Sequence, residues 1–175
     1  MHEKAYLLRK VRCVADYQFG KGAGEKLFPS DIVFSVSRRT GRVRLIYLND
    51  ELLATVRPTD GLLTLTIEGA ERLIAAECSR NILVVVEDDV SPFIERGRNV
   101  FAKHVVFASE EIRPGEEVIA VNSESKVLAV GRAKLSGREM KFFDRGVAVQ
   151  VRRGRRKKAK SAKVSCLLSG GREFA

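Results

Sequence analysis

The sequence predicts an α+β protein, in which an antiparallel sheet packed by one or two helices is followed by a small β-barrel. Two observations support this fold class. Between residues 31 and 65, short runs of alternating apolar and polar residues are separated by turn signals, which is typical of an antiparallel meander. Between residues 91 and 153, glycines recur beside breaks in an apolar strand pattern.

The first 28 residues contain an apolar pattern that glycines interrupt. Residues 6–14 fit either a first strand or the lead into a helix. Further on, Phe19, Ala23 and Leu27 fall on one helical face. Three glycines in this stretch weaken a helix by about 1 kcal/mol each. The pattern therefore indicates a weak helix that ends at Pro29.

Four strands, one helix and a further strand are predicted next. The four strand candidates are residues 31–38, 42–48, 52–57 and 62–65. Thr66 is a suitable N-cap for a helix over residues 67–77. The apolar run 81–86 predicts a buried strand. No Gly/Ser linker follows it, so we expect the two halves of the chain to pack against each other.

Four glycines organise the second half of the chain. They are Gly97 after a candidate short helix at 92–96, Gly115 in a Pro-Gly turn, Gly131 interrupting an apolar strand at 127–130, and Gly146 at the start of an alternating strand. Gly97 and Gly115 are predicted to have positive φ, as the end of a helix and a tight turn require. Gly131 indicates a bulge or a close backbone approach.

In order and spacing, these motifs resemble the PUA domain, a small RNA-binding pseudo-barrel attached to many RNA-modifying enzymes. The matching segments are Gly97 with residues 99–103, then 113–118, 128–133, 139–140 and 145–149. The resemblance implies a PUA-like β pseudo-barrel that binds structured RNA, often tRNA, and does no chemistry itself. An unrelated small β-barrel is the alternative.

The first half resembles the domain that precedes the PUA domain in archaeal tRNA-guanine transglycosylases, the enzymes of the archaeosine pathway. The matching segments are residues 16–20, 40–44, 57–66 and 69–70, and the likeness continues to residue 153. In that family these domains hold tRNA while a separate large barrel exchanges the base. The catalytic aspartates and zinc ligands of that barrel have no counterpart in this sequence. The resemblance therefore implies an RNA-binding module or one subunit of a split enzyme, with residues 1–88 and 89–153 as its two domains.

The amino-acid composition indicates a globular protein with a packed core. Hydrophobic residues make up 45% of the 175 residues, which is enough for a packed core. No run of 18 apolar residues predicts a membrane span, and the charged N-terminus does not fit a secretory signal. Three dispersed cysteines and two histidines favour reduced thiols over a disulfide framework or a metal site. We expect a cytoplasmic protein with no cofactor, no metal and no membrane partner.

Positive charge is concentrated in the second half. The net charge is +10, yet residues 1–90 hold 13 Lys and Arg against 13 Asp and Glu. Residues 91–175 hold 19 against 9, and residues 152–163 alone carry eight cations and no acid. This asymmetry predicts a polyanionic partner for the second half.

Thirteen residues are predicted to contact RNA. Arg96 and Arg98 flank Gly97, and Arg132 and Lys134 alternate along one strand, so that they project to one face. Ser136 is placed to cap a short helix that carries further cations. The predicted set is Arg96, Gly97, Arg98, Lys103, Arg132, Lys134, Arg138, Lys141, Arg145, Arg152, Arg153, Arg155 and Arg156. The alternative is a solvated surface, because residues 91–151 hold 10 cations against 8 acids.

The basic tail, residues 154–175, is predicted to add non-specific attraction to RNA. Its alternatives are a solubility tail or a clasp on an acidic partner, and its apolar stretch 164–168 is a candidate extra strand. Stacking on RNA bases requires exposed aromatic side chains. Phe101, Phe107, Phe142 and Phe143 are available, but core packing is the expectation for most of them.

The sequence therefore predicts a non-catalytic protein that binds structured RNA, with tRNA first and rRNA second. Two other functions stay open. One is an RNA-docking subunit of a separately encoded RNA-modification enzyme. The other is a factor in ribosome assembly or translation.

Overall fold

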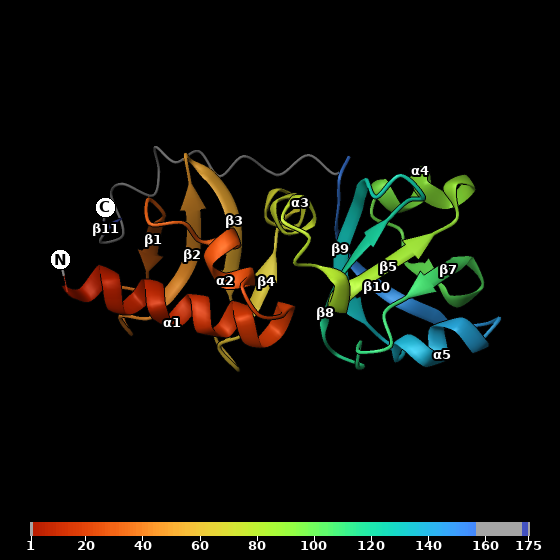
Figure 1. Cartoon of the computed structure of the whole chain (residues 1–175), viewed down its shortest axis with the longest axis horizontal. Coiled ribbons are helices and arrows are strands. Elements are labelled where there is room, and N and C mark those ends of the chain that lie inside the picture. Colours follow the sequence, from red (N-terminus) through yellow and green to blue (C-terminus); the bar gives the residue numbers. More distant parts are fainter. Residues whose placement is uncertain (1, 157–172, 175) are drawn as a thin grey trace.

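The computed structural model describes residues 2–156 and 173–174, which form two sheet-based domains lying side by side (Figure 1). The first sheet has the strand order β11-β1-β2-β3-β4 and is antiparallel, and the second is a mixed, nearly closed sheet with the order β6-β10-β9-β8-β5-β7. The predicted α+β class and the PUA-like barrel are thus confirmed. No helix among the described residues is long and apolar enough to cross a membrane.

The first domain contains helices α1 (His2–Phe19), α2 (Ala23–Leu27) and α3 (Ile67–Ala75). Its strands are β1 (Val33–Val36), β2 (Val43–Leu48), β3 (Glu51–Val56), β4 (Leu63–Leu65) and β11 (Glu173–Phe174). The second domain contains β5 (Leu83–Val86), α4 (Ser91–Glu95), β6 (Val100–Phe101), β7 (Val105–Ala108), β8 (Glu117–Val121), β9 (Val127–Ala133), α5 (Gly137–Phe142) and β10 (Val147–Gly154). Short 3₁₀ turns are η1 (Arg80–Ile82), η2 (Asp88–Val90) and η3 (Ala102–His104).

The N-terminal segment is helical, so of the two alternatives for residues 6–14 the helix is correct. Val11, Ala15 and Phe19 are buried at a spacing of four, which places one face of α1 on the core. A single helix running on to Pro29 is wrong, because Gly20 and Gly22 have φ of 112° and 86° and separate α1 from α2. The Asp16 carboxylate bridges the break by accepting a hydrogen bond of 2.7 Å from the Gly24 amide.

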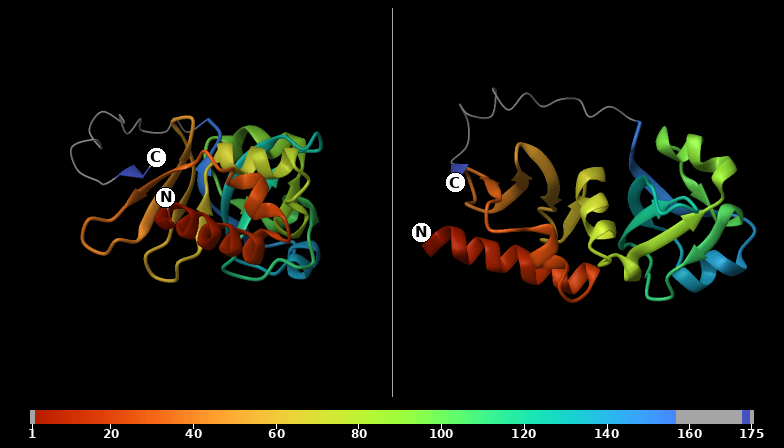
Figure 2. Two further views of the ribbon diagram at one scale, coloured as in Figure 1. Left: turned by 60° about the vertical axis from the view of Figure 1, so that its left-hand side comes forward. Right: turned by 45° about the horizontal axis from the view of Figure 1, so that its top comes forward.

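The predicted meander is present as β1 to β4. Asn49 and Asp50, the two residues between β2 and β3, both have positive φ, as a tight two-residue hairpin turn requires. Thr66 caps α3 as expected, since its hydroxyl accepts from the Gly69 amide at 3.2 Å. α1 crosses one face of this sheet, and α3 lies between the two domains (Figures 1 and 2).

The predicted strand 81–86 is present as β5, but it hydrogen-bonds to β7 and β8 in the second sheet. The division of the chain at residues 88 and 89 stays a prediction. Gly115 and Gly146 have the positive φ of turn residues, 92° and 100°. At Gly131 a Cβ would lie 2.3 Å from the Gln150 carbonyl oxygen, which confirms the close backbone approach.

The two domains share one apolar core, as the lack of a linker predicts. Ile119, Val121, Val127 and Val130 of the barrel belong to the same buried cluster as the sheet and helices of the first domain. The interface therefore fixes the orientation of the barrel relative to the first sheet.

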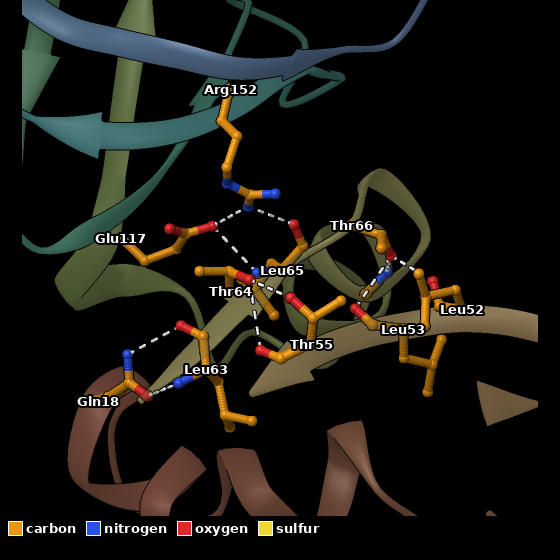
Figure 3. A network of polar contacts seen from close by, with 11 residues as sticks. Gln18, Leu52, Leu53, Thr55, Leu63, Thr64, Leu65, Thr66, Glu117 and Arg152 are labelled. Carbon is orange, nitrogen blue, oxygen red and sulfur yellow. Dashed lines mark hydrogen bonds and ion pairs between the residues drawn. The ribbon is translucent and has the colours of Figure 1, made fainter. Parts of the chain in front are cut away.

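Polar contacts complete this interface (Figure 3). The buried Glu117 carboxylate on β8 accepts hydrogen bonds from the Leu65 amide, at 3.0 Å, and from the Arg152 guanidinium on β10. Arg152 also donates to the Leu65 carbonyl oxygen at 2.6 Å. We call Leu65, Glu117 and Arg152 the domain clasp. Burial raises the pKa of Glu117, while the charge and hydrogen bond of Arg152 act in the opposite direction.

Candidate nucleic-acid interface

The turn from α4 to β6 presents cations on both sides of one glycine. The Gly97 amide donates to the Ile94 carbonyl at 2.8 Å and the Arg98 amide to the Phe93 carbonyl at 3.1 Å, which is the hydrogen-bond pattern of a Schellman motif. Gly97 has a φ of 93°, so the predicted helix end is confirmed. Arg96 and Arg98 are therefore exposed residues of a turn with a defined backbone geometry.

The anchor of α4 is Glu95, whose side chain is buried. Its carboxylate pairs with Lys126 at 3.3 Å and with Arg156 at 2.7 Å. The Arg156 amide donates to the Glu95 carbonyl at 2.9 Å, so the end of β10 is also held against α4. The turn that carries Arg96 and Arg98 is thus fixed from two sides, which limits the entropy lost when a ligand binds.

A hollow of about 390 Å³ lies beside this turn, between α4 and β6. It is lined by Val90, Phe93, Ile94, Arg98, Asn99, Val100, Phe101 and His104. Phe93 is 56% exposed and Phe101 47% exposed, so their rings are accessible to a planar partner. Apolar walls with a cation at the rim suit an unstacked nucleobase whose phosphate stays in solvent.

Arg98, in the lining of this hollow, and two cations close to it in the sequence, Arg96 and Lys103, are exposed. No ion pair joins Arg96, Arg98 or Lys103 to an acid among residues 2–156 and 173–174. His104, next to Lys103, contacts the Glu87 carboxylate through Nδ1 at 2.8 Å. We call Phe93, Arg96, Arg98, Phe101 and Lys103, with Gly97, the α4–β6 surface.

The structure brings four of the predicted RNA-binding residues together at this surface: Arg96, Gly97, Arg98 and Lys103. Arg132 and Lys134 are exposed elsewhere, and Arg132 pairs across the sheet with Glu117 on one side and Gln150 on the other. Arg138 and Lys141 lie on α5, each 3.6 Å from Glu110, and the exposed Arg145 follows that helix. The contact of each residue with RNA stays a prediction.

The predicted arginines at the end of β10 have partners within the protein. Arg152 belongs to the domain clasp, and Arg155 pairs with Glu71 of α3 at 2.9 Å. Arg156 pairs with Glu95, and Arg153 is half-buried. Arg152 and Arg155 therefore connect the two domains, in addition to any contact with RNA. Residues 157–172 and 175 of the basic tail, with the candidate strand 164–168, lie outside the described residues, and Glu173–Phe174 form β11.

One basic cluster escaped the sequence analysis. Arg38, Arg39, Arg42 and Arg44 are all exposed on the β1–β2 hairpin, which closes through a 2.8 Å hydrogen bond from the Ser37 amide to the Arg42 carbonyl. The four arginines lie within seven residues of the sequence, which could have indicated this cluster. The cluster was overlooked because charge was summed over residues 1–90, where acidic residues balance the basic ones.

The expectation that most of the four phenylalanines pack in the core is wrong. Phe101, Phe107 and Phe143 are 45–47% exposed, and Phe142 is 82% exposed. The barrel core is filled instead by small aliphatic side chains, among them Val84, Ala120 and Ala129. Phe101 and Phe107 are the strand neighbours of the buried Val100 and Ala108, so they project to the opposite, outer face of the sheet.

A second hollow, of about 310 Å³, lies between the domains and includes Gln18, Arg57, Arg113, Glu116 and Glu117 in its lining. Its lining holds two arginines against three glutamates, Glu111, Glu116 and Glu117. A lining with more acids than cations does not favour a polyanion, so we place the candidate interface at the α4–β6 surface.

Comparison with protein families accounts for both domains. Residues 83–155 match the PUA domain family. This chain is a PUA-domain protein. Residues 9–78, ahead of the PUA domain, match the patch-forming domain C2 of tRNA-guanine transglycosylase.

The relatives have the same two domains. The chain is 49% identical over 152 residues to the tRNA-guanine(15) transglycosylase of Thermococcus kodakarensis, covering 87% of this chain and 26% of that protein. It is 45% identical over 147 residues to the enzyme of the same name from Methanothermobacter thermautotrophicus, covering 84% of this chain and 22% of that protein. The chain thus spans about a quarter of the length of these relatives, and the rest of their length has no counterpart in it.

Solved structures share the arrangement of the two domains. A hypothetical protein of Pyrococcus horikoshii superposes with a TM-score of 0.72 and 27% identity, covering 87% of this chain and 92% of that one. A conserved PUA domain protein of Thermoplasma acidophilum superposes with a TM-score of 0.61 and 20% identity, covering 86% and 89%. At 20% identity, the likeness to the Thermoplasma acidophilum protein shows a common fold alone.

Proposed function

We propose that this protein binds structured RNA, in the first place tRNA, through its PUA domain, and catalyses no reaction of its own. The observation that carries the proposal is the α4–β6 surface. There Arg98 lines an accessible apolar hollow, and Arg96 and Lys103, close by in the sequence, are also exposed and form no ion pair with an acid among the described residues. The location of this surface at the motif around Gly97 that resembles the PUA family supports the assignment. A cytoplasmic location is part of this proposal.

The protein offers different side chains to the phosphate backbone of the RNA and to its bases. Arg96, Arg98 and Lys103 neutralise phosphates, which supplies affinity without sequence preference. Phe93 and Phe101 offer faces on which one unpaired base stacks at the hollow. The exposed hairpin arginines Arg38, Arg39, Arg42 and Arg44 give the first domain a second phosphate-binding surface. The basic tail is proposed to add further non-specific attraction.

A second candidate is a docking subunit that presents tRNA to a separately encoded RNA-modification enzyme. The observation that favours it is the joint match of both domains to transglycosylases that are about four times as long. Affinity purification of the full chain from its own cells tests this candidate. Recovery of an RNA-modifying enzyme in stoichiometric amount supports it, and recovery of RNA alone contradicts it.

Filter binding of tRNA transcripts across a salt series tests the proposed function. If about five cations contact phosphates, log K falls against log salt with a slope of roughly −4. An rRNA helix of equal length serves as the competitor. Failure to retain tRNA at low salt, or retention that does not change with salt, contradicts the proposal, and preference for the rRNA helix favours a ribosomal role.

A further inference from the structure

We propose that the end of α5 is a stacking site for unpaired RNA bases, separate from the α4–β6 surface. The site consists of Phe107, Lys141, Phe142 and Phe143, which we call the α5 aromatic site. The inference rests on the proposed RNA-binding function and names a second class of contact for it, with single-stranded nucleotides beside the structured part of the RNA.

The helix that carries the site is rigidly held. Ser136 Oγ accepts a hydrogen bond from the Glu139 amide at 3.3 Å, and Glu139 Oε2 accepts from the Ser136 amide at 2.8 Å, forming a capping box. The buried Met140 fixes the inner face, and α5 packs against β7 and η3. The two phenylalanines at its end are therefore displayed in fixed positions.

Three phenylalanine rings at this site are exposed: Phe142 at the end of α5, Phe143 directly after it, and Phe107 on β7. Phe142 is 82% exposed, and Phe143 and Phe107 are 47% and 45% exposed. Such side chains normally contribute to stability by burial. Each ring therefore has surface that a planar ligand can reach, most of all Phe142, while Lys141 lies over the ring of Phe107.

Cations lie between and beside the rings. Lys141 Nζ lies 5.1 Å from the centroid of the Phe107 ring, and Arg145 follows Phe143 two residues later and is exposed. Lys141 and Arg138 both face Glu110 at 3.6 Å, an exposed pairing of the kind that contributes little and that a phosphate can displace. The phosphates of a single RNA strand would lie along these cations while its bases stack on the phenylalanine rings.

The chemistry favours RNA over a protein partner. The centres of protein–protein interfaces are depleted in lysine and other charged residues. Here a lysine lies directly against one of the three aromatic rings. Interleaved rings and cations are instead the pattern by which proteins bind single strands, with stacking that tolerates every base.

The test compares two RNAs that differ only in a single-stranded extension. A fluorescein-labelled blunt hairpin and the same hairpin with a 3′ oligouridine tail are titrated with the full chain. Phe142→Ala/Phe143→Ala is expected to weaken binding of the tailed RNA about tenfold and that of the blunt hairpin less than about twofold. Phe142→Trp/Phe143→Trp should retain tail binding, because stacking needs only a ring. Tyr17→Ala, which removes an aromatic side chain of 84% exposure from α1, is the control and should leave both affinities unchanged.

Each outcome separates this inference from the proposed function. If the wild-type chain binds both RNAs and the alanine variant loses affinity equally for both or for neither, the α5 aromatic site is not a base-stacking site. If the wild-type chain binds neither RNA, the proposed function fails and the inference with it. Thermal melting of the alanine variant should match that of the wild type, since exposed side chains are removed.

Discussion

Replacement of Arg152 by methionine is expected to lower the free energy of unfolding by about 3–5 kcal/mol. The reason is that Glu117 is buried and Arg152 is the one cation hydrogen-bonded to it among the described residues. Methionine keeps the volume of the arginine stem but removes the cation that is hydrogen-bonded to the buried carboxylate, so that only the weaker attraction of Arg57 remains. It also leaves the Leu65 carbonyl without the hydrogen bond that now crosses between the domains.

The loss should depend on pH in a defined direction. Burial raises the pKa of Glu117 above the ordinary glutamate value, and without Arg152 it rises further. A folded state with a raised carboxyl pKa holds a proton that the unfolded state releases, so stability falls as pH rises through the range between the two pKa values. Urea unfolding should therefore show a larger loss for Arg152→Met at about pH 8 than at about pH 5.

Two further variants sharpen this measurement. The double variant Glu117→Gln/Arg152→Met retains an oxygen that accepts from the Leu65 amide and carries no buried charge, so it should recover most of the stability and lose the pH dependence. Arg145→Met removes an exposed cation and should change stability by less than about 0.5 kcal/mol. A loss from Arg152→Met that is equal at both pH values, or a double variant no better than the single one, would contradict the described role of the domain clasp.

Reversal of two charges at the α4–β6 surface is expected to weaken tRNA binding roughly 50-fold at about 0.1 M salt. The variant is Arg98→Glu/Lys103→Glu. Both side chains are exposed and outside the cores, so the fold should be unaffected. The affinity falls because two phosphate contacts are lost and two repulsive charges replace them. Filter binding of the same transcript to wild type and variant measures the change.

The control changes net charge equally at a distant surface. Lys21→Glu/Arg80→Glu alters two exposed cations of the first domain, where Arg80 pairs with the exposed Glu77 at 3.8 Å. Long-range electrostatics should cost this variant no more than about threefold. An equal loss from both variants would mean that the α4–β6 surface acts only through net charge, and no loss from either would place the RNA elsewhere.

Local signals in the sequence predicted local structure well. Thr66 and Ser136 cap their helices because a hydroxyl three residues ahead of an unpaired amide is sufficient for that contact. Gly97 adopts positive φ because the Schellman motif requires it. The resemblance to two known domains predicted that an antiparallel sheet is followed by a PUA-like barrel. Periodicity alone does not define this order.

Contacts between residues far apart in the chain could not be predicted from the sequence. Arg152 meets the carbonyl of Leu65, 87 residues away, and nothing in the basic run 152–156 distinguishes such an arginine from one that contacts RNA. The exposed phenylalanines were misjudged because hydrophobicity does not show which of two neighbouring apolar residues faces the core, and Val100 and Ala108 do so instead of Phe101 and Phe107. The hairpin arginines were missed because acids elsewhere in the first half cancel their charge in a sum.

Photo-crosslinking of bound tRNA, followed by identification of the linked peptides, locates the RNA on the protein. We expect the crosslinks to concentrate in residues 91–104, with Phe93 and Phe101 as the aromatic contacts beside Arg96, Arg98 and Lys103. Weaker links to the β1–β2 hairpin and to α5 agree with the additional contacts proposed above. Crosslinks confined to the hairpin or to the basic tail, with none in residues 91–104, would show that the PUA domain does not bind the RNA at the α4–β6 surface.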